Sequence, residues 1–231
     1  MVAEVSEITI VDCEGKSTRE INRLIRAAAG EVLVRSPAGR HNLGVAILKP
    51  VRVVFDGPAG WYCGGMLDGG EIEIRGNCGW SVGENTMSGQ ITVRGHAGSS
   101  AGATIRGGSL LVEGNAGARA GIAMKGGTLV VGGSVGYMSG FMMQRGRLVV
   151  CGDAADGIGD SMYEGAIYVG GTIQSLGADA VEGELTSEDE EFLGQLSARD
   201  LGPARTWTKL VAGRKLWNFS KKEFDVWKVA L

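Results

Sequence analysis

The stretch Gly114-Asn-Ala-Gly-Ala-Arg-Ala-Gly-Ile-Ala-Met-Lys-Gly-Gly-Thr-Leu-Val-Val131 has glycines at its first, fourth, eighth and fourteenth positions and ends in an apolar segment. The same pattern recurs every 19 residues along most of the chain. The first glycines of the units form an anchor column: Gly57, Gly76, Gly95, Gly114, Gly133, Gly152 and Gly171. A strict short period without insertions is typical of a solenoid.

Between the last glycine of one unit and the anchor of the next lies a short alternating segment. Ile72 and Ile74, for example, flank Glu73, and equivalent apolar pairs follow in the later units. Apolar residues two apart and bounded by glycine indicate a strand with both side chains on one face. A 19-residue period is too short for a helix–turn–helix repeat, but it suits one coil of a parallel β-helix.

We therefore predict a mainly β fold, a right-handed, single-stranded parallel β-helix of about seven 19-residue coils with small α/β caps. The expected parts are an N-terminal cap and entry at 1–50, the β-helix at 51–180 and a C-terminal helix with a basic arm at 181–231. Small or apolar residues two and six positions after the anchor are expected to fill the interior. The two columns are Ala59, Cys78, Ala97, Ala116, Val135, Ala154 and Ile173, and Cys63, Val82, Ala101, Ala120, Ser139 and Ile158.

Both ends carry helix signals. Ser17-Thr-Arg-Glu20 is a capping box that predicts a helix of about a dozen residues between strands at 5–11 and 32–34. Ser187-Glu-Asp-Glu190 is a second capping box. The basic stretch 205–228 that follows contains Trp207, Trp217 and Trp227. This stretch is either a tail folded back on the solenoid or an arm that docks on a partner, since tryptophan is enriched at interface hot spots.

Composition excludes several classes of function. The net charge of −3 gives no indication of nucleic-acid binding. No apolar run approaches the roughly 20 residues of a membrane span, and the start, Met1-Val2-Ala3-Glu4, has no signal-peptide pattern. We therefore expect a cytoplasmic protein with no nucleic-acid or membrane partner.

No group of residues in the sequence predicts a catalytic, cofactor or metal site. The glycine turns lack the Gly-Lys-Ser/Thr of a phosphate loop, and His41 and His96 have no partner pattern. Cys13, Cys63, Cys78 and Cys151 are expected to be small buried residues, although Cys63 and Cys78 could approach each other. Asp153, Asp156 and Asp160 could serve acid–base or Mg²⁺ chemistry, but turn residues are the commoner explanation for such a cluster.

One outward column is apolar in consecutive coils. If Ile72 and Ile74 point inward, the residue between them points outward. Leu111, Val130 and Val149 then form an outward apolar strip. Because monomers rarely expose such a patch, we expect a partner subunit or the C-terminal arm to cover it. Leu111, Val130 and Val149, with the three tryptophans of the basic stretch, are the candidate partner surface.

The repeated glycine turn resembles the GXGXG β-helix domain at the C-terminal end of the glutamate synthase large subunit. The resemblance covers about residues 38–180. The flanking segments Gly39-Arg-His-Asn-Leu-Gly-Val45 and Asn77-Cys-Gly-Trp-Ser-Val-Gly83 are similar to the entry of that domain. The chain's size looks like that of the family's stand-alone member in N-methylglutamate synthase, where three polypeptides correspond to the amidotransferase, β-helix and FMN portions.

The resemblance implies a non-catalytic structural subunit of a glutamate-synthase-type complex. The expected reaction of the complex is methylamine and glutamate to N-methylglutamate and ammonia. Its expected partners are a class II glutamine-amidotransferase-like subunit and an FMN-dependent glutamate-synthase-like subunit, with FMN and an iron–sulfur cluster in a partner and no cofactor in this chain. Two alternatives remain: the formylmethanofuran dehydrogenase polypeptide that has the same repeat, and an independent solenoid that binds or cleaves polysaccharide.

Overall fold

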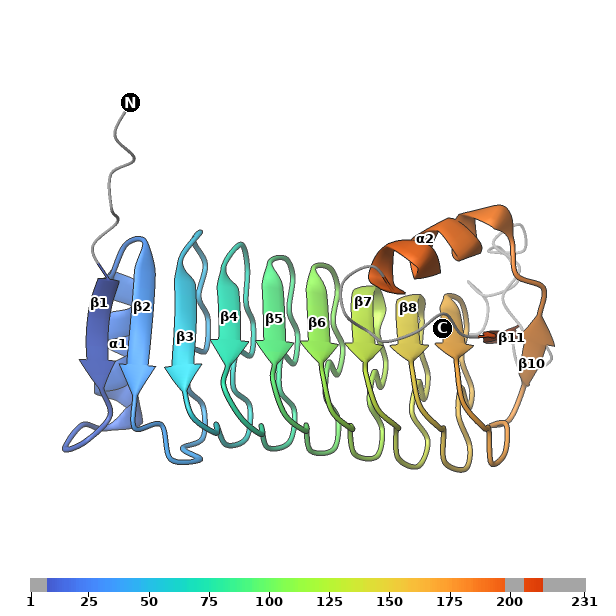
Figure 1. The fold of residues 1–231 in the computed structure, drawn as a ribbon, viewed down its shortest axis with the longest axis horizontal. Helices are drawn as coiled ribbons and strands as arrows, with labels where there is room; N and C mark the ends of the chain where they lie inside the picture. The colour runs from blue at the N-terminus through green and yellow to red at the C-terminus, as the bar shows by residue number, and fades with distance from the viewer. Residues whose placement is uncertain (1–7, 198–205, 214–231) are drawn as a thin grey trace, which may run out of the picture.

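The computed structural model describes residues 8–197 and 206–213 as a rod of stacked coils (Figure 1). The sheet consists of β1 (Ile8–Asp12), β2 (Glu31–Arg35), β3 (Arg52–Asp56), β4 (Glu71–Ile74), β5 (Gln90–Val93), β6 (Ser109–Val112), β7 (Lys125–Val131), β8 (Arg145–Val150), β9 (Ala166–Val169), β10 (Ala180–Gly183) and β11 (Thr208–Ala212). Helix α1 (Thr18–Ala27) lies beside β1 and β2, and α2 (Ser187–Ser197) lies over β7, β8 and β9.

The stacking confirms the mainly β parallel solenoid. Each strand from β1 to β9 pairs in parallel with the next, so that Ile72, Ile91 and Leu110 are neighbours in register. The stack has more strands than the seven predicted coils, because β1 and β2 of the expected cap join the same sheet. We number the coils from their anchor glycines, so that coil 1 begins at Gly57, coil 2 at Gly76, and so on to coil 6 at Gly152.

The interior consists of stacked columns of side chains. The predicted column six residues after the anchor is buried from Cys63 to Ile158, and the column two residues after it is buried up to Ala154, with Ile173 partly buried. The second of these columns also forms a ladder of isolated parallel bridges. A further inward column, ten residues after the anchor, was missed in the sequence. It contains Leu67, Thr86, Ile105, Met124, Met143 and Met162. Because these side chains differ in polarity and shape, the sequence does not show them as one repeated position.

The corners of the coils use both glycine and other residues at positive φ. The glycines seven positions after the anchor, such as Gly83 at 66°, have left-handed backbone. Each coil places non-glycine residues at positive φ, such as Ser81 at 58° and Asn85 at 58° in coil 2. The anchor Gly95, by contrast, has no positive φ, but a Cβ there would lie 2.9 Å from the carbonyl carbon of Gly76. From Gly95 onward the anchor column therefore needs glycine for close backbone approach between coils, whereas Gly57 and Gly76 also have a positive φ, of 140° and 151°.

Both ends of the rod are capped. Ser17 caps α1 in a complete capping box with Glu20, and Ile21 and Ile25 of this helix are buried in the same core cluster as the residues of β2. At the other end β11 pairs antiparallel with both β9 and β10, which ends the parallel stack. The N-cap residue of α2 is Thr186, one residue earlier than the predicted Ser187. The Thr186 side chain accepts from the Asp189 N–H, and the Asp189 carboxylate accepts from the Thr186 N–H.

Replacing Gly89 with alanine is expected to lower the free energy of unfolding by about 2 kcal/mol or more. Gly89 has a φ of 91°, and an added Cβ would lie 3.0 Å from the backbone nitrogen of Gly70 and closer still to its carbonyl oxygen. Gly194→Ala is the control, because nothing lies within 4 Å of that position and alanine favours a helix. Urea denaturation at neutral pH measures both, and equal midpoints would contradict the close-approach argument.

Candidate interaction surfaces

The outer face of the sheet is divided into a polar half and an apolar half. In register along it lie Val54, Glu73, Thr92, Leu111, Val130, Val149 and Tyr168. Charged residues surround the first members of this column, whereas α2 lies over the last members (Figure 1). The two halves of this face are therefore stabilised in different ways, by ion pairs in one and by apolar packing under α2 in the other.

Glu73 is at the centre of the polar half. Its carboxylate is 2.6 Å from Arg52 Nη2 and 3.4 Å from Nε of both Arg75 and Arg94. Burial opposes ionisation of Glu73, but the nearby guanidinium groups outweigh it and lower the pKa of this carboxyl. Arg94 continues the network to Glu113, 2.5 Å away. The network satisfies most of its charges internally, which makes it a support for the sheet rather than a charged docking site.

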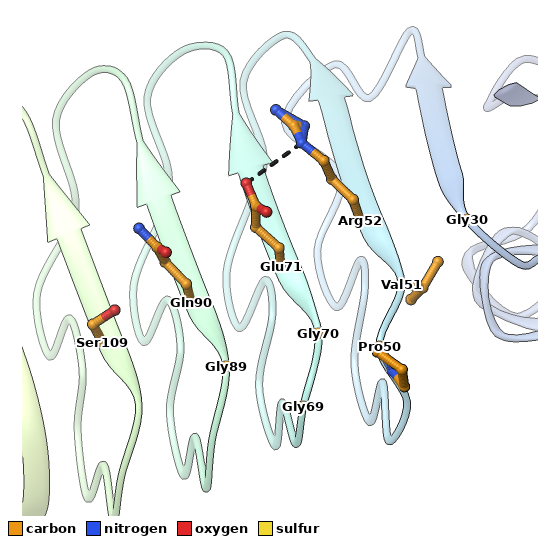
Figure 2. Close-up of a pocket in the computed structure, with 10 residues that line it drawn as sticks. All are labelled: Gly30, Pro50, Val51, Arg52, Gly69, Gly70, Glu71, Gly89, Gln90 and Ser109. Carbon is orange, nitrogen blue, oxygen red and sulfur yellow. Dashed lines mark ion pairs between the residues drawn. The ribbon is translucent and has the colours of Figure 1, made fainter. Parts of the chain in front are cut away.

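A shallow groove of about 560 Å³ runs along the beginnings of β3 to β6. Figure 2 shows its backbone wall of Gly30, Gly69, Gly70 and Gly89 and its polar side chains, Arg52, Glu71, Gln90 and Ser109. Arg52 Nε and Glu71 Oε1 are 3.4 Å apart across it. Nη1 of Arg52 is buried without a hydrogen-bond partner. The groove is open to solvent, and Pro50 and Val51 line it beside these polar side chains.

The predicted apolar strip is covered by the chain's own C-terminal segment. Val130, Val149 and Tyr168 are buried together with Leu193 of α2. The residues packed against this cluster are Leu111, Ala166, Leu185, Phe192, Leu196 and Trp207. Val130 and Val149 are therefore not accessible to a partner subunit, whereas Leu111 and Trp207 keep some exposure. Trp217 and Trp227, the other members of the candidate partner surface, lie outside the described residues.

Asp189 fastens α2 to the sheet. Its carboxylate accepts hydrogen bonds from the Tyr168 hydroxyl at 2.5 Å and from Lys209 Nζ at 2.6 Å, and it also belongs to the α2 cap. Burial opposes its charge, but the bonds from Lys209, Tyr168 and Thr186 hold the pKa of Asp189 well below its ordinary value. Burial and the hydrogen bond to Asp189 raise the pKa of Tyr168 above its ordinary value. Asp189 of α2 and Tyr168 of β9 are both buried where the helix meets the sheet, so this triad has an anchoring role.

The aspartates of coil 6 serve the turns. Asp153 accepts from the Thr172 N–H at 2.7 Å, Asp156 from the Ser175 hydroxyl at 2.8 Å and Asp160 from the Ala178 N–H at 2.9 Å. Each partner lies on the following turn of the chain, so the three carboxylates face separate partners. Within the described ranges, no group of three or more potential metal-ligating side chains is found.

His96 belongs to a ladder of hydrogen-bond acceptors between coils. From the anchor Gly76 to the anchor Gly152, the side chain one residue after the anchor accepts from the backbone N–H of its counterpart in the next coil. The acceptors are, in order, Asn77, His96, Asn115, Ser134 and Asp153. Each accepts from the backbone N–H of the residue 19 positions later, and the last donor is Thr172, at distances of 2.7–2.9 Å. His41 likewise accepts from the Trp61 N–H through Nδ1 at 2.9 Å. Both histidines therefore have a structural partner that the sequence did not reveal.

Cys63 and Cys78 approach each other in the interior, and both thiols are buried. Their hydrogen bond, together with burial, raises the pKa of Cys63 well above its ordinary value. Cys78 Sγ also lies 3.4 Å from the carbonyl oxygen of Gly60. A buried thiol with a raised pKa is a poor nucleophile, which fits a packing role.

An exposed aromatic stack, which no sequence motif indicated, lies on the turn side of the rod, the surface formed in each coil by the residues 4–11 positions after the anchor. The rings of His41 and Trp61 are 4.5 Å apart and nearly parallel, and those of Trp61 and Trp80 are 5.3 Å apart. Trp61 and Trp80 are 51% and 57% exposed. Their common place in the repeat, four residues after the anchor, was the available signal.

No helix in the part of the chain that the structure describes is long and apolar enough to cross a bilayer.

Asp189→Asn is expected to loosen α2, weakening its docking by about 3 kcal/mol, because it leaves Lys209 buried opposite a neutral group. The pKa of Asp189 is lower in the folded protein than in the unfolded chain. Its contribution is therefore complete above about pH 4, the ordinary carboxyl value, and is lost as the pH falls further. Hydrogen exchange of the α2 amides at neutral and acidic pH measures both effects.

The control for Asp189 is Glu188→Gln, because Glu188 is 80% exposed in its ion pair with Arg147 and should contribute less than about 1 kcal/mol. Equal exchange rates in the two variants would contradict the anchoring role of Asp189.

Val130→Glu is expected to detach α2, because the helix would bury an unpaired carboxylate. Exchange of the α2 amides should accelerate by about 100-fold or more, which corresponds to roughly 3 kcal/mol. Thr92→Glu, two coils away in the same outward column, is the matched control. Unchanged α2 protection and melting temperature in Val130→Glu would show that the strip does not hold the helix.

The comparisons with known proteins are limited in extent. No protein-family model matches the chain. Protein GlxC of Rhizobium meliloti (strain 1021) is 41% identical to it over 73 residues, which are 29% of this chain and 32% of GlxC. The match thus spans about a third of the length of that curated relative. Over this segment, the chain is similar to Protein GlxC.

Proposed function

We propose that the chain is a non-catalytic structural subunit of a glutamate-synthase-type complex, whose reaction forms N-methylglutamate and ammonia from methylamine and glutamate. The supporting observation is how the repeat uses its polar side chains. His96, Asp153 and their column neighbours are hydrogen-bond acceptors between coils, and the glycine array forms a continuous parallel stack. The partial similarity to Protein GlxC is consistent with this role.

In this proposal catalysis belongs to partner subunits. A class II glutamine-amidotransferase-like chain would act on the amide donor, and an FMN-dependent chain with an iron–sulfur cluster would carry the synthase chemistry. The solenoid would hold the two at a fixed separation. Its sheet, capped at both ends by other elements, is a suitable spacer, because consecutive coils are joined by backbone hydrogen bonds along its length.

Purification of the tagged full-length chain from its native host tests the proposal. We expect co-purifying polypeptides of the amidotransferase and FMN-protein classes, a flavin absorption spectrum, and N-methylglutamate formation from methylamine and glutamate. Tagged Gly89→Ala is the matched control, because it perturbs the stacking and should recover less of the complex. A colourless preparation without these partners would contradict the proposal.

Polysaccharide binding is a second candidate, because the aromatic column of His41, Trp61 and Trp80 is of the kind that it requires. The rings stack on one another, however, so a sugar would reach mainly the outer face of Trp80. Titration of tryptophan fluorescence with soluble glucans and xylans tests this candidate, with Trp80→Ala as the control. No saturable change in the wild-type protein would reject it.

A further inference from the structure

Large apolar side chains are exposed on the turn side of the rod, formed in each coil by the residues 4–11 positions after the anchor. Trp61, Trp80 and Tyr137 are 51%, 57% and 53% exposed there, and Met66 and Met87 are exposed beside them. Aromatic residues and methionine are enriched in protein interfaces, and monomers rarely expose such patches. The turn side is therefore a candidate interface, separate from the strip that α2 covers.

The aromatic stack stops at Trp80, although its column continues. Backbone hydrogen bonds keep the column in register, from the Tyr62 N–H to the Trp80 carbonyl, from Ser81 to Ser99 and from Ser100 to Ala118. The next two members after Trp80 are thus Ser99 and Ala118, both small, and the one after them is Tyr137. Coils are about 4.8 Å apart, close to the ring spacings of 4.5 and 5.3 Å. Two large residues are followed by a slot two coils long.

We propose that the turn side binds a second copy of this chain in an antiparallel dimer. Its two-fold axis passes between coils 2 and 3. Such an axis reverses the order of the coils but preserves each position within a coil. Trp80 then lies over Ser99 of the second copy, and Trp61 over Ala118. The two stacks join through their Trp80 rings into one continuous stack of six rings.

Other columns of the turn side are complementary under the same operation, which places coil 1 opposite coil 4. Tyr62 comes opposite Arg119, which allows a cation–π contact. Met66 comes opposite the small Ala123, and Asp68 comes opposite Lys125. Asp68 and Glu84 are the charged residues of the turn side in coils 1 and 2, whereas coils 3 and 4 carry Arg106, Arg119 and Lys125. Size and charge are therefore both self-complementary about one axis, which favours a second copy over an unrelated protein.

Sedimentation of the purified full-length chain between about 1 and 500 µM tests this proposal independently of the proposed function. The wild-type protein should form a dimer. Trp80→Ser, which removes a ring, and Ser99→Trp, which fills the slot, should each raise the dissociation constant at least tenfold. Ile10→Ser is the control, because Ile10 is 54% exposed on β1, away from the turn side. A wild-type chain that stays monomeric throughout, or a dimer indifferent to both variants, would overturn the proposal.

A charge exchange tests the axis. The Ser88 hydroxyl donates to Asp68 at 2.6 Å within the same chain, so Ser88→Ala is the control for the loss of that bond. Asp68→Lys should weaken the dimer, because the introduced lysine of one copy faces Lys125 of the other. Adding Lys125→Asp to that variant should restore the dimer, because opposite charges then face each other again. A double variant that binds no better than Asp68→Lys would contradict the antiparallel register.

Discussion

Every part of this molecule depends on hydrogen bonding between coils at a fixed spacing. In each coil, the strand, the bridge residue and most of the turn form backbone hydrogen bonds with the next coil. From β3 to β9 the paired strand residues are 19 positions apart, apart from a register shift beside Lys125 in β7. A residue inserted within a strand would reverse the facing of the side chains after it in that strand, so extra residues must lie in the turns or in a bulge. The strict 19-residue period is the sequence record of this constraint. It also explains why glycine occupies columns where two backbones meet without room for a Cβ.

The same constraint divides the surface into sides with different uses. On the sheet side, the outward column changes from ionic around Glu73 to apolar around Val149, and α2 covers only the apolar part. Asp189 makes this cover specific, because its carboxylate joins the cap of α2 to β9 through Tyr168 and to β11 through Lys209. The turn side has no such cover among the described residues, and its rings remain exposed.

The repeat made the fold accessible from the sequence, since Ile72 and its equivalents alternate within a period that only a short coil can satisfy. The sequence also predicted that Val130 and Val149 are covered, either by the C-terminal arm or by a partner subunit.

Other features could not be predicted from the sequence, for physical reasons. The left-handed corners at residues such as Ser81 follow no residue preference, because backbone stacking imposes the conformation. The stack of Trp61 and Trp80 depends on two residues from different coils, which a search for conventional catalytic or metal motifs does not compare. The earlier cap of α2 arises because Asp189 has tertiary partners.

The acceptor ladder one residue after the anchors from Gly76 to Gly152 has an evolutionary consequence. Asparagine, histidine, serine and aspartate take the same role in successive coils, each accepting one backbone N–H. The fold therefore requires an acceptor at these positions and not a particular amino acid. Related chains can exchange these side chains freely and diverge far in sequence while keeping the same coil. In such a family, the period and spacing of small residues would persist after pairwise identity has faded.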